Sequence, residues 1–342
     1  MTNLIDGIII SCSGFELSQN EISFFKNINP LGFVLFKRNF RNKDQIKKLI
    51  KHLKEITHNN NLLIFIDQEG GRVQRLDNNE FTKFSPQKLF GDIYIKDKDL
   101  AVNLTYKSAY LMGFELKEIG VDVNFSPVCD LMHKNSHKVI GNRSFGSDPK
   151  MVLQLSDVFC SGLEDAGIIP VPKHFPGHGR SMNDTHLETS TINSELVELE
   201  KTDFIPFNFL HKSLIVMLAH ITYTSIDKRV ATYSKKIIKN FLREKFKFKG
   251  LVLSDDISMK GISGSLTEKV ENSYNAGCDV VLYCHGILDE LKKIYPSVRE
   301  INKDSMEFFL SKSKKIKFKK KNFRKYRSDL INCKLISETN AT

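Results

Sequence analysis

A short stretch in the middle of the chain gathers side chains that can hold or transfer a proton. Residues 173–186 read KHFPGHGRSMNDTH and contain one lysine, three histidines and one aspartate. Asp184 lies two residues before His186, and an aspartate beside a histidine favours the protonated ring and fixes its orientation. Such a pair can act as a general acid and base near neutral pH. Because Pro176 and two glycines interrupt any helix or central strand, we expect a loop here.

This loop follows an apolar run, 168–171, which predicts a buried strand. In α/β folds, the loops at the C-terminal ends of the strands bind the ligand. Polar residues follow the other apolar runs in the same way. They are Asp67, Gln68 and Glu69; Asp130 and Arg143; Lys173 and His174; His220; Asp255 and Asp256; and Cys284 and His285. Charged residues at so many strand ends are poor for burial and good for binding a polar ligand, so the pattern predicts an enzyme.

The elements that must position these residues are short apolar runs separated by helical patterns. The runs span residues 6–11, 32–36, 62–66, 121–125, 168–172, 215–219, 250–253 and 279–283. The helical patterns span residues 43–56, 97–119, 151–166, 204–211, 234–246, 287–295 and 305–310. Solidly apolar strands suit a parallel sheet that is buried on both faces. Eight strands alternating with helices predict an α/β fold, a (β/α)8 barrel of the TIM type.

A doubly wound open sheet is the alternative to the barrel. The chain has no GxGxxG motif after its first strand, which counts against a dinucleotide-binding fold. Two local signals support the predicted helices. Ser18 and Glu21 have the spacing of a capping box, and Gly167 is placed to end the helix predicted at 151–166. We expect one catalytic domain over residues 1–310.

The formal net charge of +11 is concentrated near the C-terminus. Residues 312–327 contain ten basic residues and no acidic residue. Such a segment could touch nucleic acid or an anionic membrane, but we favour a solvated helix end and tail. We therefore expect residues 311–342 to be a basic tail rather than a separate domain, with no nucleic-acid partner and no stable membrane association.

The composition also indicates where the protein is located in the cell and whether it binds a metal. No apolar run approaches the length of a membrane helix, and the apolar run near the N-terminus is too short for a signal peptide, so we expect a cytoplasmic protein. The six cysteines are scattered, and we expect reduced thiols. Histidines could compete as metal ligands, but the chain has no HExxH motif and no HxxxH pair on a helix. We expect no metal.

Asp255 and its neighbour Asp256 end an apolar strand in the run GLVLSDDISM. A carboxylate at a barrel mouth can be a nucleophile, a metal ligand or a hydrogen-bond acceptor. For Asp256 we favour a helix N-cap. A further set suits a sugar, because carboxylates and cationic donors form charge-assisted hydrogen bonds with hydroxyl groups. This substrate-holding set consists of Asp67, Arg75, Arg143, Lys173 and His174.

At these residues the chain resembles glycoside hydrolase family 3, and within it the short, single-domain bacterial β-N-acetylglucosaminidase branch. The similarity extends to about Leu310 and is carried by several blocks in one order. They are GFVLFKRNF (32–40), DQEGGRVQRL (67–76), NFSPVCDL (124–131), IGNRSFGSDP (140–149), KHFPGHG with DTH (173–186), MLAHITY (217–223), LVLSDDISMKG (251–261) and AGCDVVLY (276–283).

The resemblance implies a role for each matching residue. Asp255 takes the position of the nucleophile, and His186 that of the acid/base, with Asp184 as its partner. Substrate contacts fall on Asp67, Arg75, Arg143, Lys173 and His174. The implied reaction removes a terminal, nonreducing β-linked N-acetylglucosamine with retention of configuration, through a covalent glycosyl-enzyme.

The resemblance also implies a setting. The short branch acts in the cytoplasm on N-acetylglucosamine joined to anhydro-N-acetylmuramoyl peptides, in peptidoglycan recycling. Through that process it serves cell-wall biogenesis, cell shape and cell division. It implies no cofactor, and we expect a monomer.

Departures from the family pattern are few. The loop reads DTH where DSH is common, the basic tail has no counterpart, and the chain has no tryptophan to stack on a sugar ring. Two alternatives stay open. A histidine acid/base carries less negative charge than a carboxylate and could admit phosphate, which would make the protein a β-N-acetylglucosaminide phosphorylase. The other alternative is a non-catalytic sugar-binding protein.

Overall fold

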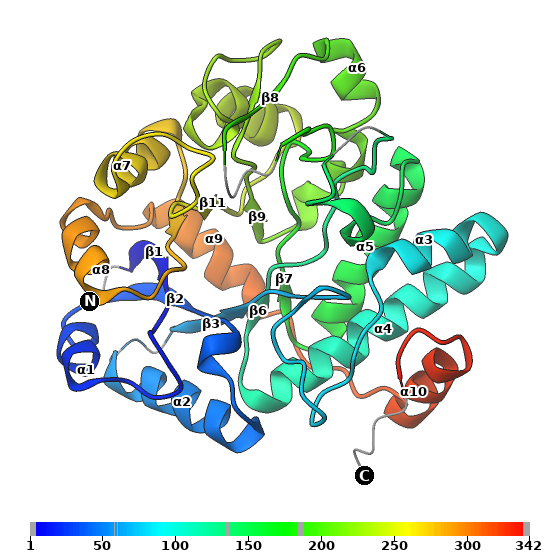
Figure 1. The fold of residues 1–342 in the computed structure, drawn as a ribbon, viewed down its shortest axis with the longest axis horizontal. Helices are drawn as coiled ribbons and strands as arrows, with labels where there is room; N and C mark the ends of the chain where they lie inside the picture. Colours follow the sequence, from blue (N-terminus) through cyan, green and yellow to red (C-terminus); the bar gives the residue numbers. More distant parts are fainter. Residues whose placement is uncertain (1–4, 58, 60, 135–136, 184–187, 338–342) are drawn as a thin grey trace.

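Eight parallel strands form one sheet in the computed structural model, which describes residues 5–57, 59, 61–134, 137–183 and 188–337 (Figure 1). Their order in the sheet is β7-β6-β3-β2-β1-β12-β11-β9. Their bounds are β1 (Asp6–Ile10), β2 (Pro30–Leu35), β3 (Leu63–Ile66), β6 (Val123–Asn124), β7 (Ile169–Pro170), β9 (Ile215–Met217), β11 (Leu251–Asp256) and β12 (Val280–Leu282). The first and the last of these strands along the chain, β1 and β12, are hydrogen-bonded neighbours.

Backbone hydrogen bonds join the two ends of this sheet. The amide of Met217 donates to Pro172 O at 3.1 Å, and the amide of Phe175 donates to Met217 O at 2.9 Å. The amide of Ala219 then donates to Phe175 O at 2.8 Å. The chain after β7 therefore pairs with β9 and its continuation, which closes the sheet into a barrel. The predicted (β/α)8 barrel is confirmed, and the doubly wound alternative is wrong.

Helices surround the barrel, most of them on its outer face (Figure 1). They are α1 (Gln19–Phe25), α2 (Lys43–Ile56), α3 (Gln87–Lys96), α4 (Lys98–Ile119), α5 (Pro149–Asp165), α6 (Leu196–Lys201), a π-helix (Ile237–Lys245), α7 (Leu266–Ala276), α8 (Leu288–Ile294), α9 (Lys303–Ser313) and α10 (Phe323–Asn332). Two small strand pairs lie beside the barrel. An antiparallel hairpin, β4 (Gln68–Gly70) and β5 (Val73–Gln74), follows β3, and β8 (Ser190–Ile192) pairs in parallel with β10 (Ile221–Tyr223).

Local signals explain where several helices begin and end. Ser18 and Glu21 form the predicted capping box at the start of α1. Gly167 has a φ of +81° directly after α5, which confirms the predicted helix end. The prediction of one helix at 204–211 is wrong, because the segment contains Pro206 and forms two short 3-10 turns.

The sequence prediction also missed α3, α6, α7 and α10, and the cause is clearest for α3. This helix has Pro86 at its N-cap position, with no side-chain cap, and a glycine in its interior. Gly91 is required there by a close approach, because a Cβ at this position would lie 1.7 Å from Phe145 O. The residue that weakens the helical signal is therefore the one that lets α3 approach the loop at Phe145, just before α5.

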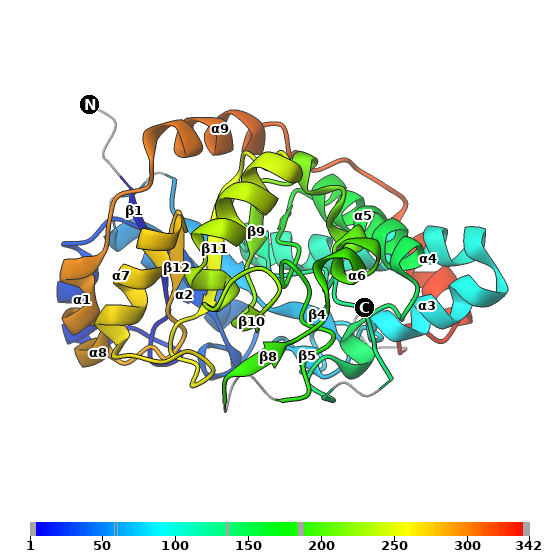
Figure 2. The ribbon, with the colours of Figure 1, turned by 90° about the horizontal axis from the view of Figure 1, so that it is seen from above.

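Two layers of apolar packing hold the barrel. Inside it, buried side chains of successive strands meet, among them Val34, Phe65, Phe125, Met217 and Leu253. Outside it, the apolar faces of α2, α4 and α5 cover the strands. Helix α9 lies across the end of the barrel opposite the hairpin β4–β5, where Met306 and Phe309 join the interior cluster (Figure 2). In the described part of the chain, no helix combines the length and the apolar character needed to cross a membrane.

Candidate active site

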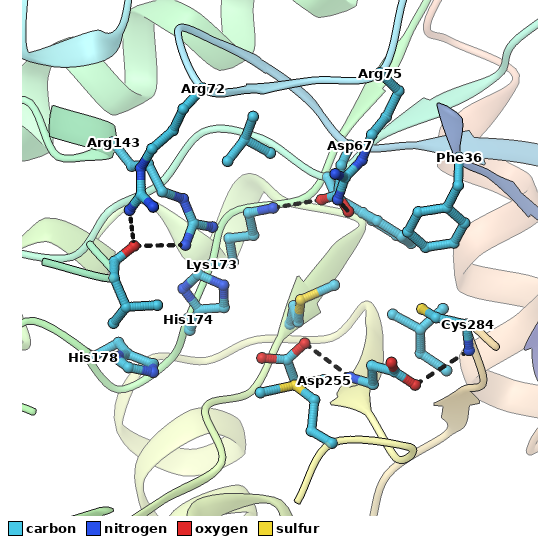
Figure 3. Close-up of a pocket in the computed structure, with 17 residues that line it drawn as sticks. Phe36, Asp67, Arg72, Arg75, Arg143, Lys173, His174, His178, Asp255 and Cys284 are labelled. Atoms are coloured by element: carbon cyan, nitrogen blue, oxygen red, sulfur yellow. Dashed lines mark hydrogen bonds and ion pairs between the residues drawn. The ribbon is translucent and has the colours of Figure 1, made fainter. Parts of the chain in front are cut away.

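A cavity of about 470 Å³ opens at the C-terminal ends of the barrel strands (Figure 3). It is lined by Phe36, Asp67, Arg72, Val73, Arg75, Phe125, Val139, Arg143, Lys173, His174, His178, Met217, Asp255, Asp256, Met259, Leu282 and Cys284. Six of the eight predicted site residues are among them. The other two, Asp184 and His186, lie outside the residues that the structure describes.

The barrel brings these residues together because each follows a different strand. Asp67 comes directly after β3, Lys173 and His174 follow β7, and Asp255 lies in β11. Arg75 reaches the same cavity from the end of the hairpin β4–β5. The C-terminal ends of parallel barrel strands meet at one mouth, so residues far apart in the chain become neighbours.

Two carboxylates, Asp67 and Glu69, and three cations form a network on one side of the cavity; Figure 3 shows the part made by Asp67, Lys173, Arg75 and Arg143. The ammonium of Lys173 donates to Asp67 Oδ1 at 2.7 Å and pairs with Glu69 Oε1 at 2.6 Å. Arg75 Nη2 donates to Asp67 Oδ2 at 2.9 Å. Arg143 donates to both oxygens of Glu69, each at 2.8 Å. Every carboxylate oxygen of the pair therefore accepts at least one charge-assisted hydrogen bond.

The network keeps its members charged in spite of burial. Burial alone would raise the pKa of Asp67, but the Lys173 ammonium and the Arg75 guanidinium outweigh it and hold that pKa well below its usual range. Burial is likewise outweighed at Glu69, where Arg143 and Lys173 lower the pKa to about 2. Burial would lower the pKa of Lys173, yet the two carboxylates raise it above its ordinary value. The result is a fixed array of charges at neutral pH.

A second polar cluster surrounds the buried carboxylate of Asp130. His174 Nδ1 lies 2.7 Å from Asp130 Oδ2, and the backbone amides of His174 and His178 donate to Asp130 Oδ1 at 3.1 and 2.7 Å. Burial would raise the pKa of Asp130, but His174 and His178 lower it to about 2. Burial, followed by the nearby His174, lowers the pKa of His178 to about 4. Asp130 therefore fixes the turn that presents both rings to the cavity.

Asp255 lies on the side of the cavity opposite the network of Lys173 and Asp67 (Figure 3). The backbone amide of Asp256 donates to Asp255 Oδ1 at 2.8 Å, which orients the Asp255 carboxylate. The helix N-cap predicted for Asp256 is wrong. Its Oδ1 accepts from the amides of Ser258 at 3.0 Å and Cys284 at 3.1 Å, so it ties the end of β11 to the chain after β12.

His220 is fully buried and contacts the backbone of Asp256. Its Nδ1 lies 2.8 Å from Thr232 Oγ1, and its Nε2 lies 3.1 Å from Asp256 O. Burial lowers the pKa of His220. His220 follows β9, as predicted for a mouth residue, but both ring nitrogens contact protein groups and it does not line the cavity. Its contacts join the segment after β9 to the backbone of the residue after Asp255.

Two residues at or next to the cavity, Arg72 and Glu69, are absent from the predicted substrate-holding set. Arg72 lies at the tip of the hairpin β4–β5, and its Nη2 donates to Lys138 O at 2.8 Å and to the carbonyls of Val139 and Ile140. Glu69 was placed at the mouth but not in the substrate-holding set. Its role follows from the bidentate contact with Arg143, which comes from a loop 74 residues away. The run EGGR was the available hint, because adjacent glycines allow a tight hairpin that turns polar residues inward.

The arrangement can hold a polyhydroxylated ligand and attack it. Cationic donors and carboxylate acceptors on one side suit hydroxyl groups, and an oriented carboxylate on the other side can act as a nucleophile or base. Among the described residues, no group of three or more histidine, cysteine or acidic side chains is placed to hold a metal ion. A (β/α)8 barrel with such a cavity at its C-terminal face is the architecture of a barrel enzyme.

Comparisons with known proteins identify the family. The model of the glycosyl hydrolase family 3 N-terminal domain matches residues 10–313. The chain belongs to this family and is a glycoside hydrolase. A Beta-hexosaminidase of Tolumonas auensis is 37% identical over 283 residues, which cover 81% of this chain and 82% of the relative. A Beta-hexosaminidase of Haemophilus influenzae is 36% identical over 299 residues, which cover 84% of each chain.

Solved structures agree with this assignment. Native NagZ from Neisseria gonorrhoeae is similar with a TM-score of 0.84 and 31% identity, and the match covers 96% of this chain and 94% of that one. The same protein in complex with N-trifluoroacetyl-D-glucosamine is similar with a TM-score of 0.83 and 30% identity, with the same coverage. The resemblance to glycoside hydrolase family 3 is therefore confirmed.

Proposed function

We propose that this hydrolase is a retaining exo-β-N-acetylglucosaminidase, which removes terminal, nonreducing β-linked N-acetylglucosamine. The observation that carries the proposal is the cavity in which Asp255 faces the network of Asp67, Lys173, Arg75 and Arg143. The sugar specificity is supported by relatives named Beta-hexosaminidase and by the similar NagZ structure that holds N-trifluoroacetyl-D-glucosamine.

The sugar is held by the network and by His174. Asp67 and the Arg75 and Lys173 cations are held in fixed positions by their mutual contacts of 2.7 to 2.9 Å. A fixed array loses little entropy when it binds a hydroxyl-rich ring. The ring then lies between this array and Asp255, with its anomeric carbon toward the Asp255 carboxylate.

In the first step, an oxygen of Asp255 forms a bond to the anomeric carbon while the bond from that carbon to the leaving oxygen breaks. His186 gives its proton to the leaving oxygen, which departs as an alcohol. In the second step, His186 takes a proton from water, and the water oxygen displaces Asp255 from the anomeric carbon. Asp184 orients the His186 ring and stabilises its protonated form. This scheme replaces one carboxylate of the usual retaining pair by a histidine.

The natural substrate in this proposal is N-acetylglucosamine joined to an anhydro-N-acetylmuramoyl peptide, cleaved in the cytoplasm during peptidoglycan recycling. The protein acts as a monomer without a cofactor. Residues 1–310 form the catalytic domain, and residues 311–342 are a basic extension rather than a second domain. These statements rest on the family resemblance of the motifs in residues 32–283.

The test is hydrolysis of a chromogenic β-N-acetylglucosaminide. Asp255→Ala should abolish turnover, because the nucleophile is lost. His186→Ala should slow this substrate less than the natural one, because a nitrophenolate leaves without protonation. Asp289→Ala and His211→Ala, on the exposed surface, are matched controls that should keep the wild-type rate.

Product analysis completes the test. Proton resonance spectra of the first product should show the β anomer, and added phosphate should not divert the product. Full activity of Asp255→Ala would refute the assigned nucleophile. A sugar 1-phosphate as the main product would show that the protein is a phosphorylase instead.

A further inference from the structure

The hairpin β4–β5 carries much of the sugar-binding network. Asp67 directly precedes β4, Glu69 lies within it, Arg72 is at the turn and Arg75 directly follows β5. Its two strands contain only three and two residues, and a two-stranded hairpin of this size is not stable by itself in water. The positions of these four side chains therefore depend on what supports the hairpin from behind.

Side-chain amides fasten the hairpin to the chain that follows it. Gln68 Oε1 accepts from the backbone amides of Arg75 at 2.9 Å and Leu76 at 3.2 Å. Gln74 Oε1 accepts from the amide of Phe84 at 3.1 Å, and its Nε2 donates to Thr82 O at 2.9 Å. The segment 82–85 thus lies directly behind the hairpin and sets its position.

The backbones of the two segments also approach closely. The amide of Gly71 donates to Phe84 O at 2.8 Å. A Cβ on Gly70 would lie 2.5 Å from Ser85 O, and Gly70 has a φ of +94°, so only glycine fits this approach. If the segment 82–85 moves, the hairpin must therefore move with it.

The last described residues of the chain hold the segment 82–85. Ile336 forms an antiparallel bridge with Phe84, and the amide of Ser85 donates to Leu335 O at 3.0 Å. The side chains of Leu335 and Ile336 are buried and belong to the same apolar cluster as Phe84. Arg327 adds a side-chain contact, because its Nη1 donates to Thr82 Oγ1 at 3.1 Å.

Helix α10 anchors this end of the chain to the barrel. Lys107 on α4 donates to Asp329 at 2.6 Å, and Tyr326 packs edge-on against Tyr110 with ring centroids 5.5 Å apart. Figure 1 shows α10, in red, beside α3 and α4. The amide of Leu335 donates back to Leu330 O at 2.9 Å, so the chain turns directly from α10 into the bridge.

We propose that residues 323–337, named here the C-terminal strap, position the hairpin β4–β5 for sugar binding. The strap lies beyond residue 313, where the family match ends. None of the strap contacts described above involves a residue that lines the cavity. The strap therefore acts through residues 82–85. The C-terminal extension is in this way a positioning element of the active site. The kinetic part of this inference rests on the proposed function.

Two shortened chains test the strap. A chain that ends at Lys334 keeps α10 and loses the bridge to Phe84, whereas a chain that ends at Ser337 keeps the bridge and serves as the control. The first should raise KM for the chromogenic β-N-acetylglucosaminide by about tenfold, the cost of one lost hydrogen bond to a charged group. Its kcat should change less than about twofold, because the hairpin contacts the sugar equally before and during reaction. The control should match the full chain.

Hydrogen exchange gives a readout that does not depend on activity. The amides of Gly71, Arg75 and Leu76 should exchange faster in the chain that ends at Lys334 than in the control, while amides of α2 stay protected. If neither shortened chain hydrolyses the sugar but this difference in exchange appears, the positioning role of the strap is supported and the proposed function is refuted. If the chain that ends at Lys334 has the same KM and the same exchange rates as the control, the proposed role of the strap is refuted.

A point variant covers the case in which the shortened chain does not fold. Arg327→Ala removes the contact with Thr82 and should raise KM in the same direction by a smaller factor, about threefold. Arg327→Lys keeps a donor and should restore most of the affinity. A fall in kcat alone, with KM unchanged in Arg327→Ala, would show a general structural role and would overturn positioning of the hairpin.

Discussion

Glu69→Gln isolates one charge of the network of Asp67, Glu69, Lys173, Arg75 and Arg143. The side chain is only 2% exposed. It accepts two hydrogen bonds from Arg143 at 2.8 Å and one ion pair from Lys173 at 2.6 Å. Glutamine keeps the size and the shape of the side chain and removes its charge. The variant leaves the three cations of the network with Asp67 as its remaining carboxylate, and breaking a buried ion pair in this way costs about 3–5 kcal/mol.

The pKa of Glu69 gives a second route to the magnitude. Burial is outweighed by Arg143 and Lys173, so the pKa falls from 4.5 to about 2 on folding. Each pKa unit corresponds to about 1.4 kcal/mol, so the ionised carboxylate contributes about 3 kcal/mol to the free energy of unfolding at neutral pH. The two routes agree, and a loss of that size lowers the melting temperature of a chain this large by about 4 °C.

The sign of the pH dependence follows from the direction of this pKa change. A carboxylate with a lowered folded pKa stabilises the protein fully above its unfolded pKa, and this stabilisation is lost as pH falls toward the folded value. The difference in free energy of unfolding between wild type and Glu69→Gln should therefore be full at pH 7. It should shrink as pH falls from about 4.5 toward 2.

Urea unfolding of wild type and variant at a series of pH values measures this difference. The control is Glu307→Gln, because Glu307 is exposed and pairs with Lys303 at 3.9 Å, and exposed pairs contribute little. The reasoning is refuted if Glu69→Gln loses no more stability than the control. A loss that stays constant between pH 7 and pH 3 would also refute it, because the effect would then not come from the charge.

Three other substitutions test single features of the structure. Gly32→Ala should prevent stable folding, because a Cβ there would lie 2.1 Å from the backbone oxygen of Leu63. Its control is Gly14→Ala, which should leave the melting temperature unchanged, because a Cβ at Gly14 would have no atom within 4 Å. Tyr223→Phe removes a buried hydroxyl that donates to a backbone carbonyl at 2.7 Å and should cost about 1–2 kcal/mol in urea unfolding. Burial lowers the pKa of His178 to about 4, so the unfolded chain binds a proton that the folded chain does not. The stability of wild type should then fall between pH 6.5 and pH 4, and His178→Gln should flatten this fall.

The barrel could be predicted from the sequence because its strands are solidly apolar. Runs such as 62–66 and 215–219 contain no alternation, and that pattern is typical of parallel strands buried on both faces. Two of the errors in the predicted helices have a local cause that the structure shows. Gly91 weakens the helical pattern of α3, and it is required there by a close backbone approach. Pro206 prevents the continuous helix expected at 204–211. Hydrophobic periodicity reports neither effect.

The site could be predicted where a residue directly follows a strand. Asp67, Lys173 and Asp255 all do, and the barrel topology brings them to one mouth. Residues that reach the cavity through loop contacts could not be found in this way. Arg72 is placed by carbonyl groups of residues 138–140, and no spacing in the sequence connects the two segments.

The C-terminal segment shows how composition alone can mislead about a role. Its surplus of lysine invites a search for an anionic partner, yet its aromatic side chains carry the informative contacts. Phe318 and Phe323 pack against Phe114 with ring centroids 6.0 and 4.8 Å apart, and Tyr326 packs against Tyr110. A segment whose apolar side chains are anchored on α4 presents its charged ones to solvent as a consequence of that docking. The surplus of basic side chains thus lies on the outer face of the C-terminal segment, and the inner face of this segment includes the strap that we propose to position the hairpin β4–β5.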